Sequence, residues 1–383
     1  MCSTRHTRAA DTSKPVLDDF AALERLSSSI LRALNPAQYL VTRAESHCQA
    51  RALHAANSWG LADLVGEETV TAHELAERAK VRPAYLKVAL RVVLQQGIFE
   101  EVGEFGSLEV RNNVLSNFLR SDRPGSLQQG IAFIGDDGMR AAESLPAAAG
   151  AGEKRTAYQV AYDTDLDYFA HVALPENQMR EKRMGQAMRE LHSAFPDSFA
   201  TEFDWGALGR GPLVDVGGGQ GATPRLLGSL YPDLQFVLFD RPTTVEQSAQ
   251  ALFASPLKGR VSFVGGDFFA PGSVPAGHQH YLLRNVLHDW DDDEVVAILR
   301  NVREAMLAPG GASSPTLLIG DLVVTPHSSE FLQSTSIQVL SLGGGMERTV
   351  MEYRALLERA GFRLERVEHL GSLETVLVAR PAE

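Results

Sequence analysis

Short apolar strands and helices alternate from residue 212 to residue 379, and this alternation constrains the fold more than any other feature of the sequence. Strands are predicted at 212–216, 235–239, 261–264, 280–283, 317–319 and 374–379, with helices between them. This rhythm is typical of a parallel sheet with helices on both faces. We therefore expect an α/β fold with a doubly wound, Rossmann-like sheet over residues 204–383, in which ligands bind at the carboxyl ends of the strands.

A glycine-rich turn follows the first of these strands. Residues 217–222, Gly-Gly-Gly-Gln-Gly-Ala, satisfy the dinucleotide fingerprint, which is a weak signal alone. Asp215 precedes the turn, and its carboxylate would oppose a pyrophosphate but attract a cation. S-adenosylmethionine, with its ammonium and sulfonium, therefore fits better than NAD, and Gly217 and Gly219 would let the backbone approach it. An NAD-dependent dehydrogenase and a turn without a ligand remain as alternatives.

Further ligand-type side chains follow the next two strands. Asp240 ends the second strand, where a carboxylate can accept hydrogen bonds from ribose hydroxyls. Asp267 and Phe268 end the third and offer an acceptor for the adenine amino group and a ring that can stack on adenine. Because these residues fall on successive strand ends, an adenosine site is favoured over independent helix caps.

His288 follows the fourth strand, ahead of a helix cap expected at Asp291 and Glu294. A histidine at this edge can take a proton, and its alternative role is that of a buried, hydrogen-bonded residue. A phenol has a pKa of about 10 and histidine about 6.5, so full transfer would be uphill by roughly 5 kcal/mol. Nearby carboxylates narrow this gap, and the candidates are Asp321 at the end of the fifth strand and Glu347 in a glycine-rich loop.

The N-terminal third has the order of a winged helix. Thr71 and Glu74 have capping-box spacing before one helix, Arg82-Pro83 opens a second, and a short hairpin is predicted over 98–111. Such a motif commonly binds DNA through its second helix. The hairpin is acidic, however, and the chain has 36 Lys and Arg against 48 Asp and Glu, a formal net charge of −12. No nucleic-acid partner is therefore expected, and a packing or dimerisation role is favoured.

Composition excludes several other classes of protein. No apolar run is long enough to span a bilayer, and two cysteines are too few for a disulfide framework or a structural zinc site. The N-terminal residues lack the apolar region of a secretory signal. We expect a cytoplasmic protein with no membrane partner and no bound metal, in which residues 1–20 form a disordered tail, with a transit peptide as the less favoured alternative.

Together these motifs resemble the S-adenosylmethionine-dependent O-methyltransferases of the plant and fungal small-molecule type, which include caffeate and hydroxyindole methyltransferases. The resemblance covers the chain from about residue 40, and residues 281–290 and 318–321 are most similar to the fungal secondary-metabolite branch. The motifs that carry it are Asp215-Val216-Gly217-Gly218-Gly219, Asp240, Gly266-Asp267-Phe268, Leu287-His288-Asp289-Trp290 and Glu347-Arg348-Thr349.

The resemblance implies a role for each matching residue. His288 would be the general base, oriented by Asp321 and Glu347, where Asp321 replaces the commoner glutamate of the family. The cofactor contacts implied are Asp215, Gly217, Gly219, Asp240, Asp267, Phe268 and Arg284, and the acceptor contacts expected are Phe133, Phe169, Met184, Met188 and Asp289. It also implies a winged-helix-like dimerisation domain at 21–120, a helical linker at 121–203 that contributes to the substrate pocket, and a homodimer.

We therefore expect methyl transfer from S-adenosylmethionine to a hydroxyl of an aromatic small molecule, phenolic or polyketide, with His288 taking the proton. The alternative is a member of the same scaffold that binds the cofactor without methylating and steers a dehydration or pericyclic rearrangement. The intact set of His288, Asp321 and Glu347 favours methylation.

Overall fold

A computed structural model describes Leu23 and residues 26–194, 198–209, 211–252, 256–371 and 373–382. The tail expected at residues 1–20 lies outside the described residues. Contacts divide the chain into a helical unit of residues 25–195 and a sheet unit of residues 196–383, to which residues 1–24 are also assigned.

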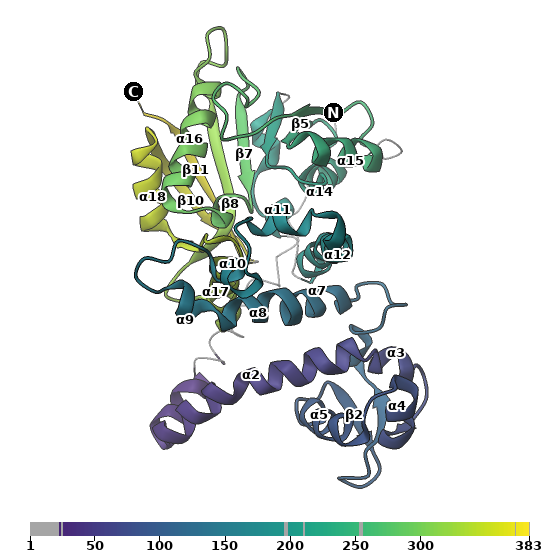
Figure 1. Ribbon diagram of the computed structural model, residues 1–383. Coiled ribbons are helices and arrows are strands. Elements are labelled where there is room, and N and C mark those ends of the chain that lie inside the picture. Colours follow the sequence, from purple (N-terminus) through teal and green to yellow (C-terminus); the bar gives the residue numbers. More distant parts are fainter. Residues whose placement is uncertain are drawn as a thin grey trace, which may run out of the picture. The chain divides into compact units, whose positions relative to one another are not determined.

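The first part of the helical unit contains the predicted helices and hairpin (Figure 1). Its elements are α2 (Pro36–Ser58), α3 (Leu61–Val65), β1 (Val70–Thr71), α4 (Ala72–Ala79), α5 (Pro83–Gln95), β2 (Phe99–Val102), β3 (Glu109–Asn112) and α6 (Val114–Asn117). The capping box is confirmed, because the Thr71 side chain accepts a hydrogen bond from the Glu74 amide while the Glu74 side chain accepts one from the Thr71 amide. The hairpin gains a third strand that the sequence did not indicate, since β1 pairs antiparallel with β3.

The rest of the helical unit is built from short helices around one long one. They are α7 (Gln128–Phe133), the π-helix η1 (Ile134–Gly138), α8 (Met139–Glu143), α9 (Leu145–Ala148), α10 (Ala157–Tyr162), α11 (Tyr168–Val172), η2 (Pro175–Asn177) and α12 (Gln178–Ser193). Helix α12 packs against α7, and α10 against α8. The π-turn places Asp137 inside the unit, where it is 1% exposed and accepts hydrogen bonds from Arg180 and Tyr162.

The sheet unit confirms the expected Rossmann-like architecture. Its strands are β4 (Pro212–Val216), β5 (Gln235–Asp240), β6 (Val261–Gly265), β7 (His280–Arg284), β8 (Thr316–Val324), β9 (Arg348–Thr349), β10 (Phe362–His369) and β11 (Glu374–Pro381). The order across the sheet is β10-β11-β8-β7-β4-β5-β6, and β9 pairs with β8. The strands β6, β5, β4, β7 and β8 run parallel.

The expectation of a wholly parallel sheet is wrong at one edge. Strand β10 was not predicted, and it forms an antiparallel hairpin with β11, which in turn runs antiparallel to β8. After its last helix the chain forms the edge strand β10 and then β11, which lies between β10 and β8.

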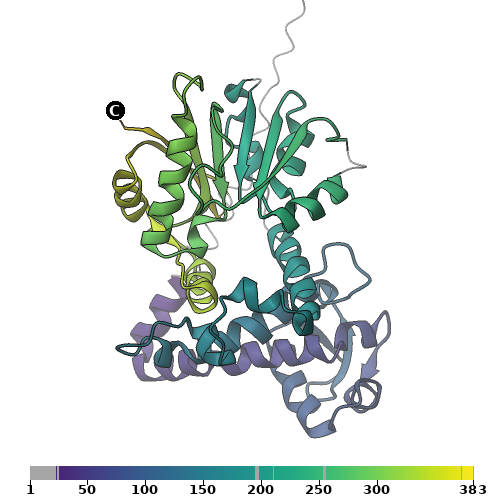
Figure 2. The same ribbon diagram turned by 45° about the horizontal axis from the view of Figure 1, so that its top comes forward.

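Helices cover both faces of the sheet. They are α13 (Ser198–Thr201), η3 (Trp205–Leu208), α14 (Ala222–Leu230), α15 (Pro242–Leu252), η4 (Leu287–Asp289), α16 (Asp292–Met306), α17 (Glu330–Gly343) and α18 (Val350–Arg359). Val214 and Ile319 point into a core with α16 and α18, which lie on the same side of the sheet in Figures 1 and 2. Leu213 and Leu318, one residue away on the same strands, point into a second core with α13 and α14. This alternation buries both faces and leaves the strand ends for polar residues.

Candidate active site

The glycine turn after β4 lies directly against Asp215. A Cβ added at Gly218 would be 2.7 Å from Oδ2 of Asp215, and one at Gly217 would be 2.8 Å from Cγ2 of Val286. Gly217 and Gly219 adopt φ angles of 75° and 53°, which favour glycine. The turn therefore has no room for side chains at Gly217 and Gly218, so only backbone lines it there.

Asp215 is the feature of this turn that fits a cationic ligand. It is 1% exposed, and its Oδ2 has no hydrogen-bond partner among the described residues. Burial raises the pKa of this carboxyl to about 7, which Arg284 opposes and Asp240 reinforces. A buried carboxylate without a donor is costly, and a ligand ammonium would supply the missing partner. The buried carboxylate at this turn thus fits S-adenosylmethionine, which carries an ammonium group.

Asp240 at the end of β5 holds the same turn in place. Its Oδ2 accepts a hydrogen bond of 2.8 Å from the Gly219 amide, and its Oδ1 accepts one of 2.7 Å from the Arg241 amide. These bonds fix the orientation of the carboxylate. Each oxygen retains a second lone pair, so the arrangement leaves acceptors for ribose hydroxyls.

Asp267 and Phe268 follow β6 as predicted. The Asp267 side chain is exposed, and its Oδ1 accepts a hydrogen bond of 2.9 Å from the Phe269 amide. Phe268 is half-buried and meets the ring of Trp290 edge-on, with 5.7 Å between ring centroids. This contact holds the Phe268 ring beside the loop that carries His288.

Arg284, at the end of β7, has a partner that the sequence did not indicate. Its guanidinium binds Glu374 of β11 through two contacts, with Nε 2.8 Å from Oε1 and Nη2 2.9 Å from Oε2. The guanidinium also lies 4.0 Å from the centroid of the Phe199 ring. Its positive charge lowers the pKa of Asp215 and thereby opposes the effect of burial on that carboxyl.

His288 lies in η4 between two buried carboxylates. Its Nδ1 is 3.0 Å from Oε1 of Glu347 and 3.2 Å from Oδ1 of Asp321. The carboxylates are wholly buried, whereas the imidazole is 14% exposed. Its other nitrogen, Nε2, lies 3.7 Å from Oδ1 of Asp289, beyond hydrogen-bond distance. We call His288, Asp321 and Glu347 the His288 cluster.

The charges around the imidazole favour its protonated form. Burial lowers the pKa of His288, but the carboxylates of Asp321, Asp289 and Glu347 outweigh this and raise the pKa well above its ordinary value. Burial raises the pKa of Asp321, while the imidazole opposes that rise. With Nδ1 directed at the acids, Nε2 is the nitrogen that can exchange a proton with a ligand.

Two further residues, Arg348 and Gly345, pack against the loop that carries His288. Arg348 is fully buried, and its guanidinium donates to the carbonyl oxygens of Leu287 at 3.0 Å and Trp290 at 2.8 Å. Gly345 packs so closely that an added Cβ would be 2.0 Å from the His288 carbonyl oxygen. The segments that carry His288 and Glu347 are therefore fixed to each other through the backbone.

The residues expected to contact the acceptor fall in both units. Phe133 and Phe169 flank Tyr168 edge-on in the helical unit, with centroid distances of 6.3 Å and 5.5 Å. On α12, Met184 is half-buried and Met188 is 45% exposed. Asp289 belongs to the sheet unit.

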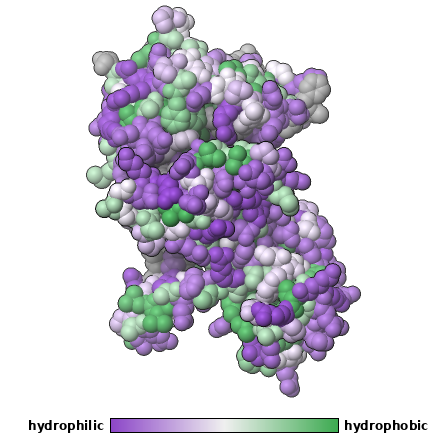
Figure 3. Space-filling view, in the orientation of Figure 1, coloured by the Kyte–Doolittle hydropathy of each residue, from purple (hydrophilic) through white to green (hydrophobic). Residues whose placement is uncertain are grey.

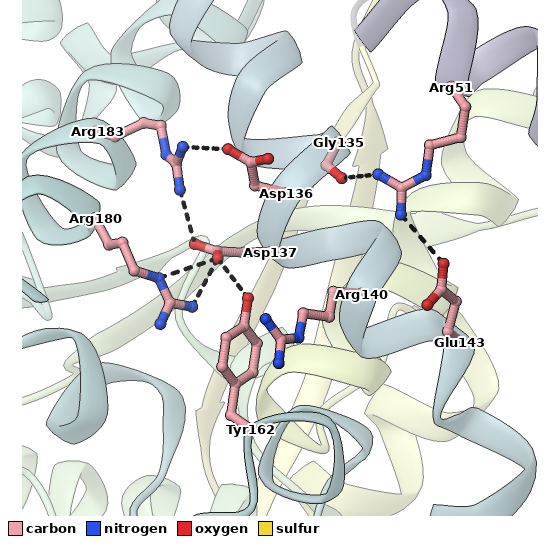
Figure 4. A pocket seen from close by; sticks show the side chains of 9 residues that line it. All are labelled: Arg51, Gly135, Asp136, Asp137, Arg140, Glu143, Tyr162, Arg180 and Arg183. Carbon is pink, nitrogen blue, oxygen red and sulfur yellow. Dashed lines mark hydrogen bonds and ion pairs between the residues drawn. The ribbon is translucent and has the colours of Figure 1, made fainter. Parts of the chain in front are cut away.

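A hollow of about 570 Å³ within the helical unit is almost wholly charged (Figure 4). Its carboxylates are paired, with Asp137 2.7 Å from Arg180 and Glu143 3.2 Å from Arg51. The ring of Tyr162 lies between two guanidinium groups. Neither the two phenylalanines nor the two methionines expected to contact the acceptor line this hollow. The lining residues are Arg51, Gly135, Asp136, Asp137, Arg140, Glu143, Tyr162, Arg180 and Arg183.

Sequence reasoning missed three residues that support the site. Tyr353 donates a hydrogen bond of 2.7 Å to Oδ2 of Asp321, Glu374 binds Arg284, and Arg348 holds the His288 loop. Arg348 belongs to the Glu347-Arg348-Thr349 motif, but nothing in the sequence indicates what its side chain contacts. Tyr353 lies in a predicted helix, where an aromatic residue usually indicates core.

Among the described residues, no helix is long and apolar enough to cross a membrane.

Comparisons with known proteins agree with this geometry. An O-methyltransferase domain model matches residues 144–363. The mitomycin biosynthesis 6-O-methyltransferase of Streptomyces lavendulae is 30% identical over 319 residues, which cover 83% of this chain and 86% of the relative. An O-methyltransferase of Aspergillus fumigatus is 28% identical over 370 residues, which cover 96% and 83% of the two chains. Relatives thus include bacterial as well as fungal enzymes.

Solved structures show the same relationship. An O-methyltransferase from neocarzinostatin biosynthesis, in complex with S-adenosylmethionine and 2-hydroxy-5-methyl naphthoic acid, matches with a TM-score of 0.72 at 25% identity. The match covers 87% of this chain and 95% of that one. The family model, the relatives and the strand-end site all agree, and the chain is a member of the O-methyltransferase domain family.

Proposed function

We propose that this enzyme methylates a hydroxyl group of an aromatic small molecule and that Nε2 of His288 accepts the hydroxyl proton. The observation that carries the proposal is the position of Nδ1, within 3.2 Å of two wholly buried carboxylates. This arrangement orients the ring and stabilises the imidazolium that forms, as a carboxylate does beside other histidine bases.

The methyl donor is S-adenosylmethionine, which supplies an electrophilic methyl carbon when bound. Its proposed contacts are the backbone at Gly217 and Gly219, with Asp215 for the ammonium, Asp240 for the ribose, and Asp267 and Phe268 for the adenine. Arg284 supports this site by favouring the ionised form of Asp215.

The raised pKa of His288 bears directly on the proton transfer. A free phenol at about 10 and a free histidine at about 6.5 leave a gap of roughly 5 kcal/mol. Each pH unit by which the carboxylates raise the imidazole pKa removes about 1.4 kcal/mol of that gap. The cluster thus makes His288 a stronger base than a solvent-exposed histidine.

The aromatic nature of the acceptor is supported by names of relatives and by residue types. The neocarzinostatin enzyme binds a naphthoic acid, and another relative is named a phenazine O-methyltransferase. In this chain we propose acceptor contacts from Phe133, Phe169, Met184 and Met188 of the helical unit and from Asp289 beside His288. The relatives are named as methyltransferases, so a rearrangement without methyl transfer is not favoured.

We further propose that the protein is a homodimer. Large apolar side chains are exposed on the stretch before α2 and at the start of that helix. They form the green patch at the lower left of Figure 3. A second copy would remove this surface from water. The exposed residues are Leu26, Ile30, Leu31, Leu34, Leu40 and Val41.

We propose a separate role for each of the three segments expected from the sequence. Residues 21–120 serve dimerisation, 121–203 contribute to the acceptor pocket, and 204–383 bind the cofactor and perform the transfer. The proposed location is the cytoplasm.

His288→Ala tests the proposed function. We expect turnover of a phenolic acceptor, followed by mass spectrometry of the methylated product, to fall at least 1,000-fold, because general base and imidazolium stabilisation are both lost. Cofactor affinity, measured by calorimetry, should stay within about twofold. Equal losses of turnover and affinity would contradict the assignment of His288 as the base.

A further inference from the structure

Within the described residues, Tyr353 is the one side chain besides His288 that forms a hydrogen bond or ion pair with Asp321. It lies in α18, is fully buried, and its hydroxyl is 2.7 Å from Oδ2 of Asp321. The other oxygen of the same carboxylate, Oδ1, faces Nδ1 of His288 at 3.2 Å. One carboxylate thus connects a tyrosine on one element to the proposed base on another.

The charge balance of the cluster explains why such a donor is needed. Asp321 and Glu347 are both wholly buried and face the same Nδ1, so two negative charges share one imidazole. An oxygen of Asp321 and an oxygen of Glu347 lie within 4.8 Å of each other. Two negative charges this close favour protonation of one of the two acids. A proton on Asp321 would remove a carboxylate that the imidazolium needs.

We propose that Tyr353 is a positioning residue that keeps Asp321 ionised and turned toward His288, and thereby makes His288 an effective base. The proposal rests on the proposed function of His288. Its chemistry is hydrogen bonding only: the tyrosine hydroxyl donates and the carboxylate accepts, and no bond to carbon is made or broken.

The environment of each group is consistent with this role. Burial, reinforced by Asp321, raises the pKa of Tyr353 well above its ordinary value, so the hydroxyl stays a donor throughout the assay range. Burial raises the pKa of Asp321, and the Tyr353 hydrogen bond lowers it. The other groups that face the ring are Asp289 on η4 and Glu347, while Arg348 contacts the loop backbone rather than the ring.

Tyr353→Phe removes only the hydroxyl and has a matched control. Tyr281 is also fully buried in the sheet unit, and its hydroxyl donates 2.7 Å to the Pro275 carbonyl, away from the cluster. In Tyr353→Phe, Asp321 should hold a proton more readily, so His288 should become less basic. We expect the NMR titration of the His288 ring to move about one pH unit toward acid, and kcat to fall about tenfold. Tyr281→Phe should change neither.

A double-mutant cycle separates this role from a general effect on packing. If Tyr353 acts through Asp321, Tyr353→Phe should cause less than a twofold further loss of kcat in an Asp321→Asn background. Unchanged NMR titration in Tyr353→Phe, or a full tenfold loss in the Asn background, would overturn the proposal. The NMR titration of the His288 ring needs no turnover, so it tests the Tyr353 coupling independently of the reaction. If His288→Ala contradicts the proposed function but Tyr353→Phe still shifts this titration, the proposed function is refuted and the coupling of Tyr353 to His288 stands. Thermal unfolding and cofactor affinity, followed in parallel, confirm that each variant is folded.

Discussion

Replacing Asp215 by asparagine removes the carboxylate beneath the glycine turn and keeps nearly the same side-chain volume. Asp215 is 1% exposed, and its Oδ2 has no hydrogen-bond partner in the part of the chain that the structure describes, so the main effect of the change is on buried charge. Without a ligand that charge is unfavourable, and with a ligand cation it becomes a binding contact. The same substitution should therefore have opposite effects on stability and on cofactor affinity.

The effect on stability follows from the pKa of the carboxyl. Its ordinary value is 3.8, and burial raises it to about 7 in the folded protein. Between these values the folded state holds a proton that the unfolded chain has released, so stability falls as the pH rises. At 1.36 kcal/mol per pH unit this loss reaches about 4 kcal/mol above pH 7. Asp215→Asn avoids it, so it should be up to about 4 kcal/mol more stable at pH 8 and show no advantage near pH 4.

The effect on binding has the opposite sign. A hydrogen bond to a charged group contributes about 1.5–3 kcal/mol, so Asp215→Asn should bind S-adenosylmethionine roughly 10- to 100-fold more weakly at pH 8. Binding to the unaltered protein at pH 6.5 should release most of one proton, because the cation lowers the pKa of Asp215. The asparagine variant should release none from this group.

Calorimetry in two buffers of different ionisation enthalpy measures the proton release, and urea unfolding at pH 5 and pH 8 measures the stability. Asp233→Asn, an exposed aspartate of the same unit, is the control and should match the unaltered protein in both assays. Equal cofactor affinity in Asp215→Asn, or binding without proton release, would refute the role of this carboxylate.

Three further predictions concern other parts of the molecule. Gly345→Ala should lower kcat at least tenfold at unchanged cofactor affinity, because the added Cβ would be 2.0 Å from the His288 carbonyl oxygen. The control is Gly211→Ala, whose added Cβ has no atom of the described residues within 4 Å. Normal kcat in Gly345→Ala would show that the loop adapts. Donor atoms of the His288 cluster lie within 4.8 Å of one another, yet proton transfer needs no cation there, so EDTA should leave kcat unchanged. A loss restored by Mg²⁺ would contradict this mechanism. Leu34→Glu, at a side chain 78% exposed, should convert a dimer into a monomer in light scattering, whereas Leu230→Glu should not; a monomeric parent protein would disprove the interface.

Much of the fold was predictable because the central strands are continuous apolar runs that end at polar residues. Strand β10 was missed because its sequence alternates buried Phe362 and Leu364 with exposed charged residues. That pattern is typical of a strand at the edge of a sheet, whereas the predicted strands are continuous apolar runs, which are typical of central parallel strands. The antiparallel hairpin at this edge was missed with it.

The site was predictable to the extent that strand ends meet at one edge of a sheet. Asp321 was expected at the end of the fifth strand but lies within β8, and Glu347 lies in the loop before β9, so their roles rest on the family resemblance. The strand-end rule accounts for His288, which follows β7. It gives no information on which side chains support these residues, since Tyr353 is 32 residues from Asp321 and Glu374 is 90 from Arg284. Such contacts depend on how helices and edge strands pack, which spacing along the chain does not encode.

Every side chain that orients the proposed base belongs to one of the two units. The His288 cluster, Tyr353, Arg348 and Gly345 all fall within residues 196–383, while most of the residues proposed to contact the acceptor fall within 25–195. Mutations that alter acceptor preference can therefore accumulate in one half of the chain without disturbing the proton-accepting half. This separation gives a physical route by which duplicated genes could diverge toward new acceptors while inheriting the same acid–base chemistry.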